Sequence, residues 1–241
     1  MKKLGIIAAP GWFDPTLKEF SDLHASELEV TQTILPPAGF DYSFEAIEHS
    51  AEGLLIAAQQ LSAAGCDLII QVGPAFAYLA GGSAEGARAL ERELSERCGV
   101  TVILNGVAVL DALDDLGAKN LTMSCPYYDA EWKAVVGDFF EKSGYHITAF
   151  ETFVEQGLFP NQDLVSARGY QFTDEEVIES VKRCCAASTD SDAVLIGGSG
   201  VRSLRWKSQL QEDVGLPMVP ADFALYQRVV SALDLNAERL S

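Results

Sequence analysis

The chain has 241 residues, with 35 Asp and Glu against 17 Lys and Arg, so its formal net charge is −18. A surface this negative repels phosphate backbones and anionic lipid, which argues against nucleic-acid binding and against docking on a membrane surface. The apolar fraction of 48%, with 20 Gly and 9 Pro, is that of an ordinary globular protein and excludes a disordered or collagen-like chain.

The N-terminus and the cysteines indicate the compartment. The apolar run that starts at Leu4 stops at Pro10 and Gly11, so we interpret it as a first strand and not as a signal peptide. No stretch approaches the roughly 18 apolar residues that a membrane span needs. An odd number of cysteines without a C-x-x-C pair argues against a disulfide framework and a structural zinc site. We therefore predict a cytoplasmic protein with reduced thiols at Cys66, Cys98, Cys125, Cys184 and Cys185.

Apolar runs of strand length alternate with longer segments of helical period along the chain. β-Branched runs bounded by Gly or Pro are typical of buried parallel strands, and the helices between them supply the crossovers. We predict strands at 4–9, 28–34, 67–72, 100–104, 120–125, 146–152, 193–196 and 217–219. We predict helices at 44–64, 84–98, 108–113, 130–143, 174–187, 204–214 and 223–235. The pattern indicates an α/β fold with parallel sheets flanked by helices.

The second half of the chain repeats the plan of the first. Segments 5–11, 66–73 and 93–102 have similar counterparts at 121–127, 191–198 and 209–218. Such a repeat predicts two similar lobes related by a pseudo-two-fold axis, formed by 1–112 plus 218–241 and by 113–217. Because ligands bind at the carboxyl ends of parallel strands, we expect a ligand cleft between the lobes.

Four turns that follow predicted strands would line this cleft. Small or Gly-rich turns expose backbone N–H groups, which bind carboxylate or phosphate oxygens when a helix follows. None of the turns matches a nucleotide-binding P-loop and no Lys adjoins the two glycine turns, so a carboxylate is the better ligand. The predicted binding residues in these turns are Pro10, Gly11, Gly73, Pro74, Ala75, Gly197, Gly198 and Gly200, and the third turn is Cys125-Pro126-Tyr127-Tyr128.

The order of five motifs resembles the aspartate/glutamate racemase superfamily, in particular the branch of arylmalonate decarboxylases and maleate isomerases. The motifs are the openings 4–10, 67–73 and 190–195, the sequence Pro126-Tyr127-x-Asp129, and the ending 214–219. The resemblance covers nearly the whole chain. It implies a two-lobed fold and a cofactor-independent lyase or isomerase that acts on a small carboxylate or dicarboxylate.

In that family the chemistry comes from cysteine, with one thiol at a strand end of each lobe, or only the second thiol in the decarboxylases. The matching positions here are Gly73 and Gly198. The resemblance therefore implies a mechanism that does not use the family's cysteine pair. We leave the proton source open among Tyr127, Ser199, Cys125, Asp222 and water. A rival hypothesis is a catalytically silent member that binds a carboxylate, and a third is an unrelated function on a shared architecture.

Tyr127 is the clearest residue that the resemblance carries over, because the family places a tyrosine hydroxyl here to hold a substrate carboxylate or stabilise an enediolate. The alternative is a tyrosine that only packs in the core. Tyr42 lies in the loop where related enzymes place a second tyrosine, and Phe40 or Phe44 is an equal candidate for that place.

Three further residues have both a functional and a structural interpretation. Cys125 is either a displaced thiol or a small buried residue, and free cysteine is commonly buried. Arg202 is either a clamp on a carboxylate or half of a surface salt bridge. Asp222 is either a base in the cleft or the N-cap of the last helix, as Asp129 is predicted to be for the helix from Ala130.

The remaining sequence features carry no catalytic signal. The three histidines show no metal-ligand spacing and no Ser-His-Asp order, so we predict neither a metal nor a cofactor. The predicted partner is a small-molecule carboxylate. Whether the protein forms a homo-oligomer is left open, with the apolar helix face at 223–230 as the natural surface for it.

Overall fold

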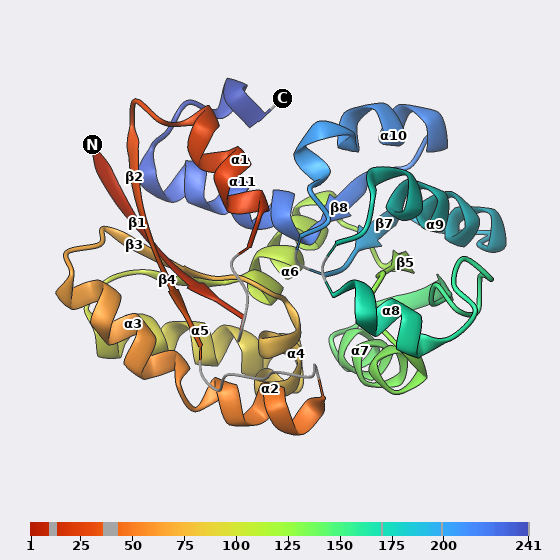
Figure 1. Ribbon diagram of the computed structural model, residues 1–241, viewed down its shortest axis with the longest axis horizontal. Helices are drawn as coiled ribbons and strands as arrows, with labels where there is room; N and C mark the ends of the chain where they lie inside the picture. The colour runs from red at the N-terminus through yellow and green to blue at the C-terminus, as the bar shows by residue number, and fades with distance from the viewer. Residues whose placement is uncertain (10–13, 36–42, 170, 199, 241) are drawn as a thin grey trace.

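The computed structural model describes residues 1–9, 14–35, 43–169, 171–198 and 200–240 (Figure 1). Its two parallel four-stranded sheets, flanked by helices, confirm the predicted α/β fold. The first sheet has the order β2-β1-β3-β4, from strands β1 (Lys2–Ala8), β2 (Leu28–Ile34), β3 (Leu68–Gln71) and β4 (Val102–Leu104). The second has the order β6-β5-β7-β8, from β5 (Asn120–Ser124), β6 (His146–Phe150), β7 (Ala193–Ile196) and β8 (Met218–Pro220).

Helices lie between consecutive strands along the chain. Those of the first half are α1 (Thr16–Leu23), α2 (Phe44–Ala51), α3 (Leu54–Ala63), α4 (Ala75–Gly81), α5 (Ala84–Cys98) and α6 (Asn105–Leu116). Those of the second half are α7 (Ala130–Lys142), α8 (Gln162–Arg168), α9 (Asp174–Ala187), α10 (Lys207–Val214) and α11 (Ala221–Leu233), with short 3-10 helices η1 (Ser203–Arg205) and η2 (Ala237–Leu240).

All eight predicted strands are present, but some helix predictions were wrong. The segment 44–64 forms two helices, α2 and α3, with a break just before Leu54. At the break the Gly53 N–H donates to the Ser50 carbonyl in a tight turn that ends α2. Glycine is a poor helix former, so a break there has little cost. The short helices α1, α4 and α8 were not predicted, and α6 begins at Asn105 instead of Ala108.

The repeat extends to individual hydrogen bonds. At the start of β3, the Asp67 carboxylate accepts the Lys3 N–H at 2.7 Å; in the second lobe, the Asp192 carboxylate accepts the Lys119 N–H at 2.9 Å. The equivalent strands β3 and β7 are each followed, two residues later, by a glycine with a left-handed backbone: Gly73 at φ +102° and Gly198 at φ +94°. The two lobes therefore share their strand order, strand starts and strand ends.

We predicted one lobe from residues 1–112 plus 218–241 and the other from residues 113–217, and these limits remain a prediction. The strand pairing places the start of the last segment differently. β8 pairs with β7, so residues 218–220 lie in the second sheet. Figure 1 shows α11 returning from β8 to the first lobe, where it packs against α6 and lies beside α1. The ring of Tyr226 on α11 stacks on Phe20 of α1 with centroids 4.3 Å apart.

Aromatic packing also joins the lobes. Tyr78 of α4, in the first lobe, contacts the rings of Phe139 and Phe140 on α7, with centroids 4.6 and 5.3 Å apart. All five cysteines are free, as predicted. Within the described residues, no helix combines the length and the apolarity that crossing a bilayer requires.

Candidate active site

The turn after β3 is held by two buried amide side chains. The Gly73 N–H donates to Asn105 Oδ1 at 3.1 Å, and Gln71 Nε2 donates to the Gly73 carbonyl at 2.9 Å. Both side chains are at most 1% exposed. The amide of Gly73, predicted to bind a ligand, therefore already has a partner in the protein. Pro74 is the N-cap of α4, and Ala75 is its first residue.

Cys125 follows β5 and is fully buried. Burial raises the pKa of the Cys125 thiol to about 12, although hydrogen bonds from the backbone N–H groups of Tyr127 and Tyr128 act in the opposite direction. At neutral pH the sulfur is consequently a protonated thiol. Such a group can donate a proton but is a poor nucleophile.

The Tyr127 ring closes the space beside the second glycine turn. A Cβ atom built on Gly198 would overlap Cε2 of Tyr127, lie 2.8 Å from Cδ2 and lie 3.4 Å from the Cys125 sulfur. Gly197 donates its N–H to the Ser124 carbonyl at 2.8 Å, which continues the pairing of β7 with β5. The structure thus brings Cys125, Tyr127 and the glycine turn together, as the sequence predicts.

Asp222 anchors the segment that follows this turn. It is the second residue of α11, whose N-cap is Pro220. Its buried carboxylate accepts the Ser203 N–H at 2.8 Å, the Ser203 hydroxyl at 2.6 Å and the Phe223 N–H at 2.9 Å. Burial raises the pKa of Asp222, and these hydrogen bonds oppose the rise. Asp129, by contrast, is the N-cap of α7, as predicted, because its carboxylate accepts the N–H groups of Glu131 and Trp132.

Removing the Ser203 hydroxyl tests this anchor. Ser203→Ala is expected to lower the free energy of unfolding by about 1–3 kcal/mol, because it leaves a buried carboxylate oxygen short of one donor. Urea unfolding measures the change. Ser21→Ala is the matched control: its exposed hydroxyl bonds only to the Lys18 carbonyl, so a change within about 0.5 kcal/mol is expected. Equal losses in the two variants would contradict the anchor.

Arg202 takes part in a salt bridge between the lobes. Its guanidinium contacts the Glu19 carboxylate of α1 at 2.8 and 2.9 Å, and Arg205 joins the same carboxylate at 3.4 Å. Arg202 also has a left-handed backbone, at φ +56°. The side chain predicted as a possible clamp on a ligand is therefore paired with an acid of the protein.

A second buried carboxyl group lies near Asp222. Asp14 Oδ1 accepts the Thr16 N–H at 2.8 Å and the Thr16 hydroxyl at 2.6 Å, while the buried Oδ2 has no hydrogen-bond partner among the described residues. The Thr16 hydroxyl lies 2.5 Å from the Tyr226 hydroxyl. Burial raises the pKa of Asp14 to about 6, and the nearby charges of Asp222 and Glu19 add to the rise.

Comparison with known proteins identifies the relatives of this fold and site. A model of the arylmalonate decarboxylase family matches residues 22–240. The chain belongs to the arylmalonate decarboxylase family. Among curated proteins, none matches it.

Solved structures of related enzymes share the fold. A mutant of arylmalonate decarboxylase in its liganded form is 18% identical, with a TM-score of 0.77 over 97% of this chain and 93% of that one. Maleate isomerase from Pseudomonas putida S16 is 17% identical, with a TM-score of 0.79 over 97% and 93%. Maleate cis-trans isomerase from Nocardia farcinica, bound to Tris, is 17% identical, with a TM-score of 0.79 over 98% and 93%.

Four of the predicted site residues, Pro10, Gly11, Tyr42 and Ser199, lie outside the described residues. Gly200 is described and has a left-handed backbone at φ +78°. Phe44, the alternative to Tyr42, starts α2, and its ring meets that of Trp132 edge-on with centroids 4.6 Å apart. The first and second lobes thus meet at this aromatic pair.

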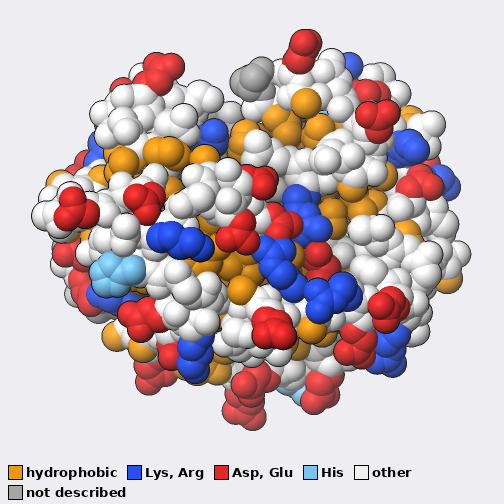
Figure 2. Space-filling model, turned by 180° about the vertical axis from the view of Figure 1, so that it is seen from behind, with side chains coloured by type: hydrophobic (Ala, Val, Ile, Leu, Met, Phe, Trp, Pro, Cys, Tyr) orange, Lys and Arg blue, Asp and Glu red, His pale blue; other side chains and the backbone are white. Residues whose placement is uncertain are grey.

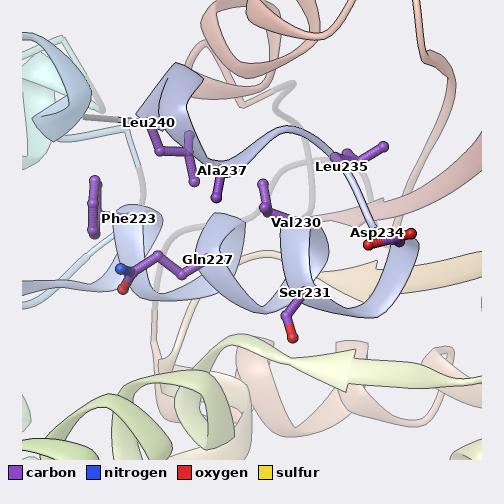
Figure 3. Close-up of a pocket in the computed structure, with 8 residues that line it drawn as sticks. All are labelled: Phe223, Gln227, Val230, Ser231, Asp234, Leu235, Ala237 and Leu240. Atoms are coloured by element: carbon purple, nitrogen blue, oxygen red, sulfur yellow. The ribbon is translucent and has the colours of Figure 1, made fainter.

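Cavities in this family member lie both near to and far from the glycine turns. One of about 460 Å³ has Tyr127 in its wall and is lined from both lobes, by Phe44 of α2 and Trp132 of α7. A cavity of about 530 Å³ lies between α11 and η2, where Ala237 and Leu240 point toward α11 and Val230 points toward η2 (Figure 3). Its lining includes no residue of the turns, so we associate only the first cavity with the site.

Acidic and basic side chains are distributed differently on the surface. On the face in Figure 2 acidic side chains are scattered widely, and Lys and Arg gather near the centre. A carboxylate ligand must therefore be held by local donors. In the part of the chain that the structure describes, no group of three His, Cys, Asp or Glu side chains is arranged to hold a metal ion.

Proposed function

We propose that the protein is a cofactor-independent lyase or isomerase, similar to arylmalonate decarboxylase and maleate isomerase, that acts on a small carboxylate or dicarboxylate. The observation that carries the proposal is the family match over residues 22–240. The paired glycine turns at equivalent strand ends support it, because they form the part of the fold where two lobes can offer backbone groups to one ligand.

The mechanism works without cysteine at positions 73 and 198. The left-handed backbone of Gly198 and the Tyr127 ring beside it support this part of the proposal, because they disfavour any side chain at 198. Cys125 then offers the nearest thiol from the neighbouring strand end. Its sulfur lies 3.4 Å from the place of a Cβ atom at 198.

Tyr127 and Cys125 have different roles in the proposed reaction. Loss of CO₂ from a malonate leaves the electron pair of the broken carbon–carbon bond on the substrate as an enediolate, and the Tyr127 hydroxyl donates a hydrogen bond to its negatively charged oxygen. A protonated thiol at Cys125 supplies the proton to carbon, and water returns the proton to sulfur. Asp222 is a weaker candidate because both of its oxygens accept hydrogen bonds from Ser203. Ser199 stays a candidate from the sequence.

Proton NMR in D₂O with a panel of small acids tests the proposal. The panel contains malonates, maleate and hydroxy- and amino-dicarboxylates. Consumption of an acid, or deuterium incorporation into it, supports catalysis and identifies the bond that reacts. Saturable binding without reaction supports the alternative of a silent carboxylate-binding member. Neither reaction nor binding contradicts both functions.

Tyr127→Phe is expected to lower kcat roughly tenfold to a hundredfold on the acid that reacts. A hydrogen bond to a charged group contributes about 1.5–3 kcal/mol, and here it is needed most in the transition state. Steady-state kinetics measures the change. Tyr145→Phe is the control, because the Tyr145 hydroxyl bonds to Asp114 at 2.7 Å, away from the glycine turns. Unchanged kcat in Tyr127→Phe would remove the hydroxyl from the mechanism, and Cys125→Ser then tests the proton donor.

Location and partners remain part of the proposal. Five free thiols support a reducing compartment such as the cytoplasm. The net charge of −18 supports a small-molecule carboxylate as partner in place of nucleic acid or membrane. Whether the protein forms a homo-oligomer stays open, and sedimentation of the purified protein decides it. The apolar face of α11 is not the surface for it, because its apolar side chains are buried in the core of the same chain: Ala224, Leu225, Tyr226, Val229 and Val230.

A further inference from the structure

The two glycine turns have the same backbone but are held differently. By the internal repeat, Gln71 corresponds to Ile196, and Asn105 corresponds to Ala221. The first-lobe turn accepts and donates hydrogen bonds with the amides of Gln71 and Asn105. Ile196 and Ala221 have no polar side-chain atoms. The first turn therefore carries a polar support that the equivalent positions of the second lobe cannot supply.

Asn105 also connects the two lobes. Its Oδ1 accepts the Gly73 N–H at 3.1 Å, and its Nδ2 donates to the Ala221 carbonyl at 2.6 Å. Ala221 is the first residue of α11, directly after β8 of the second sheet. The next residue, Asp222, holds Ser203 just beyond the second glycine turn. One buried path of hydrogen bonds thus leads from the first turn to the segment after the second.

The packing around Asn105 leaves the turn little freedom. Asn105 is 1% exposed, so water does not compete for its hydrogen bonds. A Cβ atom built on the next residue, Gly106, would lie 2.6 Å from the Cβ of Ala77 and 3.0 Å from the Pro74 carbonyl oxygen. The start of α6 is therefore packed directly against the turn and against α4.

We infer that Asn105 is a positioning residue: it sets the Gly73 turn relative to α11, and so aligns the two halves of the carboxylate site. The inference rests on the proposed function for the identity of the ligand. Each end of the amide has one partner of the complementary kind. A side chain that lacks the acceptor leaves the buried Gly73 N–H unsatisfied, and one that lacks the donor loses the hydrogen bond to the Ala221 carbonyl.

Asn105→Asp distinguishes this role from simple packing. The variant keeps the shape of the side chain and the acceptor for Gly73, but places an oxygen against the Ala221 carbonyl. A protonated carboxyl group donates to that carbonyl, whereas an ionised one cannot. Burial at this position, where Asn105 is 1% exposed, favours the neutral form of a carboxyl group and raises its pKa above the ordinary value. We therefore expect Asn105→Asp to bind the acid within about threefold of wild type at pH 5.5 and at least tenfold more weakly at pH 8. Wild type serves as the reference at each pH.

Titration of malonate, or of the panel acid that binds wild type, followed by NMR, measures the affinities. Asn236→Asp is the matched control: Asn236 Oδ1 accepts the Glu238 N–H at the exposed C-terminal end, a role that aspartate also fills. We expect it to follow wild type at both pH values. Affinities of Asn105→Asp that equal those of wild type at both pH values would overturn the inference.

Amide hydrogen exchange of Gly73 tests the same link without any ligand. We expect the Gly73 N–H to exchange at least tenfold faster in Asn105→Ala than in wild type, in protein whose thermal unfolding shows that it is folded. Unchanged exchange would overturn the inference. If wild type binds none of the acids, the proposed function is wrong, and this exchange measurement alone decides whether Asn105 holds the turn.

Discussion

Gly198→Ala is expected to lower the free energy of unfolding by roughly 2–5 kcal/mol. Two costs add. A left-handed backbone costs an L-residue about 1–2 kcal/mol, and Gly198 has φ +94°. The new Cβ atom also overlaps the Tyr127 ring, and overpacking of a rigid core costs about 1–3 kcal/mol. Urea unfolding measures the sum. Gly198→Cys is expected to lose at least as much, because it adds the same Cβ atom and a sulfur.

Gly215→Ala separates the two costs. Gly215 has a similar backbone, at φ +75°, but no atom lies within 4 Å of a Cβ built there. We expect this control to lose only the backbone cost of about 1–2 kcal/mol. In a Tyr127→Ala background, the loss of unfolding free energy caused by Gly198→Ala is expected to fall to the same value. A double-mutant cycle measures this change. Equal losses at 198 and 215 in the native background would show that Tyr127 does not crowd the turn.

The strands were predictable because each is a continuous apolar run between polar or glycine residues. The internal repeat was predictable for the same reason, since strand ends such as Gly73 and Gly198 keep both spacing and residue type. Helices α1, α4 and α8 were missed because they have only seven or eight residues, too few to show a helical period. Their ends are determined by tertiary contacts instead.

The turns of the site were predictable, but their hydrogen bonds were not. Gln71 was a visible signal, as a polar residue at the end of an apolar strand, and its burial makes it a candidate that sequence reasoning passed over. Asn105 bonds to a residue 116 positions away, and Asp222 to one 19 positions away. Pairs at such distances follow from the packing of α6 against α11, which one sequence without relatives does not reveal.

The two lobes hold their glycine turns with different kinds of residue. An ancestral pair of equal lobes would offer the same backbone groups from both sides. Here the first lobe has Gln71 and Asn105 to hold its turn, while the second places Cys125 and Tyr127 against its own. We interpret this as a difference of role, in which the first lobe keeps its turn in a fixed position and the second lobe carries the proton transfer of the proposed reaction.

The stability of the wild-type protein is expected to fall, relative to Asp14→Asn, as the pH rises from 4 to 7. Burial raises the pKa of Asp14 from its ordinary value of 3.8 to about 6. Between these values the folded state keeps a proton that the unfolded chain has lost. Rising pH therefore favours the unfolded chain, by about 3 kcal/mol once Asp14 is ionised in both states, and most of the loss lies between pH 4 and 7.

Urea unfolding of both proteins at intervals of pH measures this difference. Asparagine keeps an acceptor for Thr16 and has no charge to bury, so subtraction of its curve cancels the titration of every other carboxyl group. Asp129→Asn is the control, because Asp129 caps α7 at a more exposed position and asparagine caps equally well. A parallel course of the wild-type and Asp14→Asn curves would show that Asp14 is already ionised at pH 4.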